Sequence, residues 1–284
     1  MIAFAHRNLK IFFRDRSAVF FSLLSSLIIV GLYVLFLGDV YVGNFPNVSN
    51  ARELLDNWVM AGLLATTAVT GGIGAFSVKI DDRARKIEKD FLSSPVARAH
   101  LDAGYLLGAL VVDILLCLFT LLLAEAYIVL NGGRWLSFPV LCRLLMMIVA
   151  ACVAGVCLVF CLASLLKSPS AFSAAATVTG TLIGFLTGIY LPIGALPAPV
   201  QWIIRLFPIS HAAALFRQIM MQIPLEAAFS GAPVEAREKF ELALGIRFQF
   251  GESQLSPAGN LVILLGSAAV FFALAVLRES RRRR

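Results

Sequence analysis

Charged residues are scarce in this chain, because Asp, Glu, Lys and Arg make up only 14% of its 284 residues. Soluble domains contain roughly 25% of these residues. Hydrophobic residues make up 60% of the chain, and its mean hydropathy is +0.87. The shortage of charge excludes a water-soluble globular domain and indicates a membrane protein.

Sequence motifs that mark an enzyme are also missing. The dipeptide Gly-Lys occurs nowhere, so the chain lacks the phosphate-binding loop GxxxxGK[ST]. HExxH and GxSxG are absent too, and the three histidines are scattered along the sequence. The five cysteines show no spacing typical of disulfides or zinc sites; they are Cys117, Cys142, Cys152, Cys157 and Cys161. We predict no catalytic site, no metal site and no cofactor held by this chain, and we interpret the cysteines as packing residues.

Six long apolar runs are what the chain does contain. An apolar helix needs about 20 residues to cross the hydrocarbon core, and only helices or closed barrels satisfy all backbone groups there. Unbroken apolar runs favour helices over the alternating strands of a barrel. We therefore predict an all-α integral membrane protein with one transmembrane domain, residues 1–284. Its predicted spans are 18–37, 58–78, 105–130, 144–166, 171–191 and 258–277.

The positive charge follows the predicted topology. If the N-terminus lies inside and the six spans alternate, 16 of the 24 Lys and Arg residues fall in inner segments. This agrees with the positive-inside rule. Both termini are thus expected in the cytoplasm. The net charge of +7 is explained by topology, and we expect no nucleic-acid partner.

Residues 1–17 form an amphipathic pattern, with His6, Arg7, Lys10 and Arg14 on one side of a helix. Such a helix lies in the membrane interface. Two interpretations remain equal on the residues alone: a membrane anchor, or a docking surface for a cytoplasmic partner.

Prolines break the outer segment 192–256. Proline ends helices, so we expect two re-entrant or interfacial half-helices at 200–207 and 210–221. Further along, residues 227–244 have the pattern of a polar helix, whereas 240–250 alternate as a strand does. The sequence does not decide between these two predictions.

Two features lie inside predicted spans. Gly180, Gly184 and Gly188 recur every four residues in span five, a spacing that lets helices approach closely. The seam could lie within the chain or between two chains. Asp113 is a carboxylate well inside span three, and such residues usually face the bundle interior. It could contact cargo or relay protons, but a packing role is the stronger interpretation.

Residues 79–103 are the one long charged stretch, with 11 Lys, Arg, Asp or Glu among 25 residues. We predict a short solvated helix from Asp81 to Lys89, followed by a few apolar side chains and a turn at Pro95. Such a segment suits a groove on a partner protein, although an ordinary solvated loop explains the same charges.

The segment from Trp58 to Val111 resembles the permeases of ATP-binding-cassette exporters of the type 2 architecture. That family shows R-D-R-E-x-G-T-L-E-R-L-x-x-S-P-x-x-R between spans two and three. Residues in corresponding places are Asp82, Arg83, Glu88, Leu92, Ser94, Pro95, Arg98 and Gly104. This chain has Arg85-Lys86-Ile87 where the family usually has a glycine. A second family pattern, N-P followed by an arginine, matches Pro208 through Arg217, with Phe207 in place of the asparagine.

The resemblance implies a half-transporter in a bacterial plasma (inner) membrane. Two such subunits, identical or paralogous, would pair in the bilayer and join two cytoplasmic ATPase subunits, which bind ATP and Mg²⁺. Family cargoes include drugs, antibiotics, peptides and lipids, usually exported; the apolar walls here favour amphipathic cargo. Expected ATPase-coupling residues are Arg7, Lys10, Arg14, Asp82, Arg83, Glu88, Leu92, Pro95 and Arg98. Gly180, Gly184 and Gly188 are expected in a subunit or helix seam, and Asp113, Pro208, His211 and Arg217 along the translocation route or its gate.

Two other functions compete with this one. A secondary transporter driven by an ion gradient would show inverted repeats and paired intramembrane charges, and the sequence shows neither. A membrane assembly or sensor subunit that does not transport could share the same architecture. A neighbouring gene encoding GxxxxGK[ST] would favour the ATP-driven function over both.

Overall fold

The computed structural model describes residues 1–43, 45, 48, 50–93, 98–166, 168–251 and 253–281, without the side chains of Lys89, Leu92 and Arg98. Over these residues the chain is helical apart from one two-stranded hairpin. Six helical segments are long and apolar enough to cross a membrane. The prediction of an all-α integral membrane protein is confirmed.

The first span, Arg16–Gly43, combines α2 (Arg16–Leu32), the π-helical stretch η1 (Tyr33–Leu37) and α3 (Gly38–Gly43). The other spans are α4 (Ala51–Ala84), α6 (Arg98–Leu130), α7 (Phe138–Leu165), α8 (Pro169–Leu186) and α13 (Pro257–Arg281). Most helices extend beyond their apolar runs, because polar turns continue them outside the hydrocarbon core. The exception is α8, which ends at Leu186 and not at the predicted residue 191.

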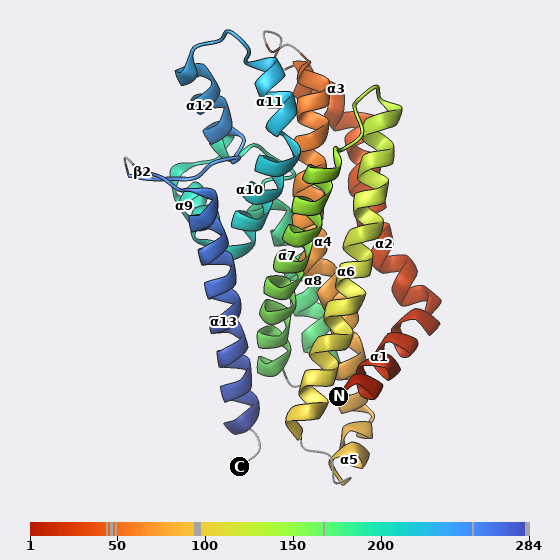
Figure 1. The fold of residues 1–284 in the computed structure, drawn as a ribbon. Helices are drawn as coiled ribbons and strands as arrows, with labels where there is room; N and C mark the ends of the chain where they lie inside the picture. Colours follow the sequence, from red (N-terminus) through yellow and green to blue (C-terminus); the bar gives the residue numbers. More distant parts are fainter. Residues whose placement is uncertain are drawn as a thin grey trace.

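Figure 1 shows the spans running roughly side by side, with the polar connections gathered at the two ends. The N-terminal helix α1 (Ile2–Arg14), the short helix α5 (Ile87–Leu92) and the last turn of α13 lie at one end, called the basal end below. Helices α11 (Gln222–Ala228) and α12 (Val234–Ala243) lie at the opposite, distal end. The even number of spans brings both ends of the chain to the basal side.

Helix α4 is the centre of the bundle and packs against α2, α6, α7, α8 and α10 (Pro208–Met220). Small residues and hydroxyl groups suit this position, because polar side chains join helices where lipid offers no hydrophobic drive. Thr66 lies 3.1 Å from Thr187, and Thr67 lies 3.2 Å from Ser26, in both cases oxygen to oxygen. These contacts tie α4 to the end of α8 and to α2.

The closest approach between two spans occurs at Gly155 of α7. A Cβ atom added there would overlap the carbonyl group of Ala68 on α4. Only glycine lets the two backbones come this close. Gly155 therefore forms a tight helix seam within the described chain. The stripe in span five stays a predicted seam, either within the chain or between two chains.

Replacing Gly155 by valine should destabilise the subunit, because α4 and α7 must separate to accommodate the branched side chain. Overpacking typically costs about 1–3 kcal/mol, so the melting temperature of the detergent-solubilised subunit should fall by several degrees. The matched control is Gly180→Val on α8, where an added Cβ meets no described atom within 4 Å. Equal melting temperatures for the two variants would contradict the seam at Gly155.

The predicted interface helix is α1, which ends at Arg14. It buries Ala5, Asn8 and Phe12 against the bundle and packs mainly on α6. The carboxylate of Asp15 accepts a hydrogen bond from the backbone N–H of Ala18, 3.0 Å away, and so caps α2. The chain therefore turns at Asp15 from the interface into the first span.

The short solvated helix predicted from Asp81 to Lys89 is wrong in its boundaries. Residues 81–84 form the last turn of α4, and α5 begins only at Ile87. Lys86 adopts a left-handed backbone with φ of 63°, which breaks the helix between the two. This tight turn stands where related permeases usually have a glycine.

The outer segment contains the two expected half-helices, α9 (Ala198–Leu206) and α10, each with proline in its first turn. Before them lies the 3-10 turn η2 (Ile193–Ala195). Both of the competing predictions for residues 227–250 hold in part. Helix α12 covers Val234–Ala243, and a hairpin of β1 (Gln249–Phe250) and β2 (Ser253–Gln254) follows, with Phe250 opposite Ser253.

Candidate functional site

Asp82, near the end of α4, is the centre of an ion-paired cluster at the basal end. Arg7 on α1 donates two hydrogen bonds to the Asp82 carboxylate, at 2.7 and 3.0 Å. The hydroxyl of Tyr105 on α6 donates a third at 2.7 Å. The hydrogen bond to Asp82 raises the pKa of Arg7 above its usual range, so the Arg7 guanidinium stays charged. One carboxylate thus holds α1, α4 and α6 together.

A second set of pairs adds α13 and α5 to the cluster. Arg83 on α4 donates to Glu279 on α13 at 2.7 Å and to Glu88 on α5 at 3.2 Å. Lys79, one helical turn earlier, donates to Asp102 on α6 at 3.0 Å. The Lys79 side chain is only 2% exposed. Poorly exposed pairs are screened less by solvent and salt than surface pairs, so these contacts hold the helix ends firmly.

Aromatic contacts fasten α5 to α1. The rings of Phe4 and Phe91 meet edge to face at 5.0 Å between centroids, and the Arg7 guanidinium lies 5.0 Å from the centre of the Phe91 ring. We call the whole set the basal junction; its members are Phe4, Arg7, Lys79, Asp82, Arg83, Glu88, Phe91, Asp102, Tyr105 and Glu279. It joins α1, α4, α5, α6 and α13 through side chains.

A different polar cluster lies toward the distal end, around Arg217 of α10, whose side chain is completely buried. Its Nη2 donates to the carbonyls of Thr187 and Gly188, at 2.8 and 3.2 Å, and its Nη1 lies 3.5 Å from the Gly245 carbonyl. The guanidinium also lies 4.8 Å from the centre of the Trp58 ring on α4.

Trp58 completes this cluster, because its indole N–H donates to the carbonyl of Leu244 at 2.8 Å. Gly188 and Gly245 both have positive φ, of 69° and 64°, and glycine adopts such turns without strain. We call Trp58, Arg217 and these carbonyls the distal clamp. It joins the end of α8 and the turn after α12 to α4 and α10.

His211 lies on α10, one turn from its start at Pro208. The ring nitrogen Nδ1 lies 2.7 Å from Oδ1 of Asn260 on α13, and Nε2 lies 2.9 Å from the carbonyl of Arg205. Both ring nitrogens are therefore engaged, and the ring is fully buried. The side chain fixes α10 to α13 and to the end of α9.

A protein-family model described as ABC-2 family transporter protein matches residues 49–277 of this chain. The match covers most of the sequence, including α4 and all later spans. The chain belongs to this family. A comparison with curated proteins found no match. The ABC-2 family supplies permeases, the membrane subunits that associate with an ATP-binding-cassette ATPase. This chain is accordingly a multi-pass membrane permease subunit.

Only some of the coupling residues predicted from the sequence meet in the permease. Arg7, Asp82, Arg83 and Glu88 lie together in the basal junction. Lys10 and Arg14 are exposed on α1. Pro95 lies outside the described residues, and of Leu92 and Arg98 only the backbone is described.

The glycine stripe of span five does not continue as one helical face. Gly180 faces open space among the described atoms, whereas Gly184 packs against the ring of Tyr190. Gly188 lies beyond the end of α8, in the turn of the distal clamp. Of these three glycines, Gly180 alone has open space around its added Cβ among the described atoms.

Three of the four residues predicted along the route are buried in this conformation of the permease, and Pro208 is half-buried. Asp113, His211 and Arg217 each have 0% exposed surface, and Pro208 occupies the first turn of α10. Arg217 and His211 hold elements together. Asp113 instead lies beside Cys117 and Cys152.

Sequence reasoning missed several members of the basal junction. Glu279 lies 196 residues from Arg83, and no spacing rule connects the two. Tyr105 and Asp102 stand at the start of a predicted span, where a polar residue is ordinary. A single acid within the basic C-terminal stretch RESRRRR is the one sequence signal that could have marked Glu279.

Proposed function

We propose that this permease is the membrane subunit of an ATP-driven exporter, in which the basal junction passes the movement of a separate ATPase to the spans. The observation that carries this proposal is the junction itself. It connects α1 and α5, which lie at the basal end, to three spans by ion pairs and ring contacts. A force applied to α5 therefore reaches α4, α6 and α13 together.

Exposed cations support the basal end as the docking surface. Lys10 and Arg14 on α1, and Arg85 and Lys86 in the turn before α5, all point their charges to solvent. Complementary charge guides the encounter of two proteins, so an acidic surface on the ATPase fits this end. ATP and Mg²⁺ would bind to the ATPase. The positive-inside rule supports a cytoplasmic location for this end, and we propose that the membrane is the plasma membrane of a bacterial cell.

The spans leave room for a second permease subunit. Only 11% of the apolar window of the first span and 17% of that of α8 are buried within the chain. Large apolar side chains are exposed there, among them Phe20, Phe21 and Leu182, and Gly180 opens the face of α8. We infer that two subunits pair along these helices and that cargo passes along their seam.

An amphipathic cargo fits the walls of the permease. A groove of about 610 Å³ lies between α7, α10 and α13. Met146, Leu261 and Leu265 give it an apolar wall, while Arg143 and Gln222 supply polar groups. Ligand sites typically combine such apolar walls with a few polar groups. Drugs, antibiotics, peptides and lipids share this chemistry, and export is the expected direction.

Purification of the tagged permease from its native membrane tests the proposal. We expect an ATP-binding-cassette ATPase to copurify, and the native mass to equal two permease and two ATPase subunits. Reversing two charges in the turn before α5, with Arg85→Glu and Lys86→Glu, should release the ATPase without lowering the amount of permease. The matched control is the same reversal at two exposed cations of the distal end, Arg134→Glu and Lys239→Glu. A permease that purifies without any ATPase would overturn the proposal.

A further inference from the structure

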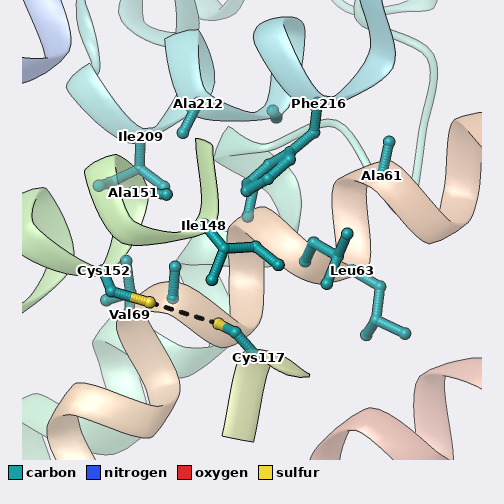
Figure 2. Packing of buried hydrophobic residues seen from close by; sticks show 14 of the residues in the cluster. Ala61, Leu63, Val69, Cys117, Ile148, Ala151, Cys152, Ile209, Ala212 and Phe216 are labelled. Atoms are coloured by element: carbon teal, nitrogen blue, oxygen red, sulfur yellow. Dashed lines mark hydrogen bonds between the residues drawn. The ribbon is translucent and has the colours of Figure 1, made fainter. Parts of the chain in front are cut away.

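Two cysteine thiols and a carboxylate meet inside the bundle, between α6 and α7. The Sγ atoms of Cys117 and Cys152 lie 3.6 Å apart. Figure 2 shows these two side chains pointing toward one another. Asp113 precedes Cys117 by one helical turn on α6. The three ligand atoms, one from each residue, all lie within 4.8 Å of one another, and all three residues are buried.

The Asp113 carboxylate lies beside the Cys152 thiol and the Gly72 backbone N–H. Neither of its oxygen atoms makes a hydrogen bond within the described residues, and the residue has 0% exposed surface. Gly71 of α4 leaves space for the Asp113 carboxylate, because a side chain at this position would overlap Oδ1 of Asp113. An ionised carboxylate is costly to bury unless a positive charge compensates it, so this group is either protonated or paired with a cation.

We propose that Asp113, Cys117 and Cys152 bind a thiophilic divalent cation of the zinc class. The Zn–S distance is about 2.3 Å in a tetrahedral site, which puts two sulfur ligands roughly 3.8 Å apart. The observed Sγ–Sγ distance of 3.6 Å is close to this expected separation of two sulfur ligands. The carboxylate supplies a third ligand of a type that zinc accepts, and soft thiolates select such ions over Mg²⁺ and Ca²⁺.

A cation bound here would compensate the carboxylate and contact both sulfur atoms at once. An S–H···S hydrogen bond uses the two thiols and adds nothing to the carboxylate. A disulfide would need the sulfur atoms about 2.05 Å apart, and it too bypasses Asp113. When the ion binds, both thiol protons leave to solvent, because the thiolate is the form of cysteine that ligates a metal. Two thiolates, one carboxylate and the divalent ion then carry one net negative charge.

A bound ion would brace α6 against α7 beside the glycine face of α4. The site consists of this chain's own residues and does not depend on any ATPase. Its failure and the failure of the proposed function are therefore separate outcomes.

Binding of Cd²⁺ to the detergent-purified permease tests the site, because cadmium replaces zinc and absorbs in the ultraviolet when bound to thiolate. The variant Cys142→Ser, Cys157→Ser, Cys161→Ser retains Cys117 and Cys152 as its only cysteines and leaves the site untouched. We expect one Cd²⁺ per chain in the wild type and in this variant. X-ray absorption should show two sulfur ligands and lighter ligands around the ion.

Changes within the site should abolish that signal. Cys117→Ser and Cys152→Ser should each lose the thiolate absorption, and Asp113→Asn should weaken Cd²⁺ binding while keeping both sulfur ligands. Should a site variant fail to fold, the ligand count in the three-serine variant still decides. The proposal is overturned if that variant binds no Cd²⁺, or if its bound ion shows fewer than two sulfur ligands.

Discussion

Replacing Asp82 by asparagine should reduce cargo-stimulated ATP hydrolysis by the assembled transporter to its basal rate. The change keeps the size of the side chain but removes the charge that accepts two hydrogen bonds from Arg7 and one from Tyr105. Hydrogen bonds to charged groups contribute about 1.5–3 kcal/mol. Since 1.4 kcal/mol corresponds to about a factor of ten, stimulation should fall tenfold or more. The measurement is ATPase activity in liposomes with and without cargo.

Asp81 provides a matched control for this prediction. It is the preceding residue in the same helical turn and is exposed, so Asp81→Asn should leave stimulation unchanged. Arg7→Gln should reproduce the loss, and the double variant Arg7→Gln, Asp82→Asn should be no worse than either single change, because both remove one contact. Additive losses would mean that the two side chains do not act through their ion pair. Normal stimulation in Asp82→Asn would remove the junction from the coupling route.

Replacing Arg217 by methionine should produce the largest loss of stability in the permease. Methionine keeps the length of the side chain but donates no hydrogen bond, so the buried carbonyls of Thr187 and Gly188 lose their donor. Each buried polar group left without a partner costs about 1–3 kcal/mol, which predicts a loss of roughly 2–5 kcal/mol. Thermal unfolding in detergent, followed by tryptophan fluorescence, measures the change through Trp58 and its neighbours.

The control for this second prediction is Arg205→Met on α9. The Arg205 guanidinium also donates to a backbone carbonyl, that of Gln249 at 3.1 Å, but its side chain is only partly buried. We expect this variant to unfold close to the wild-type temperature. Arg217→Lys should recover only part of the loss, because an ammonium group lacks the planar fork of donors. If Arg217→Met and Arg205→Met unfold together, the distal clamp is not a stabilising contact.

The spans and the half-helices were predictable because their causes are local. Apolar runs dictate membrane helices, and Pro208 opens α10 where it stands in the sequence. The short helix and hairpin at residues 234–254 also left local signals, although each signal predicted its element too long. The end of α4 was harder, because nothing nearby shows that Asp81 continues the helix and that Lys86 adopts a left-handed backbone.

Four members of the basal junction were predicted, but its contacts and the cysteine cluster could not be, because both depend on contacts between distant segments. Cys152 comes near Cys117 only after α6 and α7 pack, and their separation of 35 residues matches no metal-binding pattern. The glycine contact between α4 and α7 is also set by packing and has no spacing pattern in the sequence. Gly180, Gly184 and Gly188 have the spacing of a seam, yet the tightest approach occurs at Gly155, where α4 happens to cross.

The position of that crossing has a mechanical consequence. Ala68, which Gly155 touches, stands at the middle of α4, so each end of this unbroken helix lies about 25 Å away at 1.5 Å per residue. The contact can serve as a fulcrum. A tilt of about 5° would swing Asp82 by roughly 2 Å and Trp58 by roughly 1 Å in the opposite direction. A movement of α4 at the basal end would then move its distal end in the opposite direction.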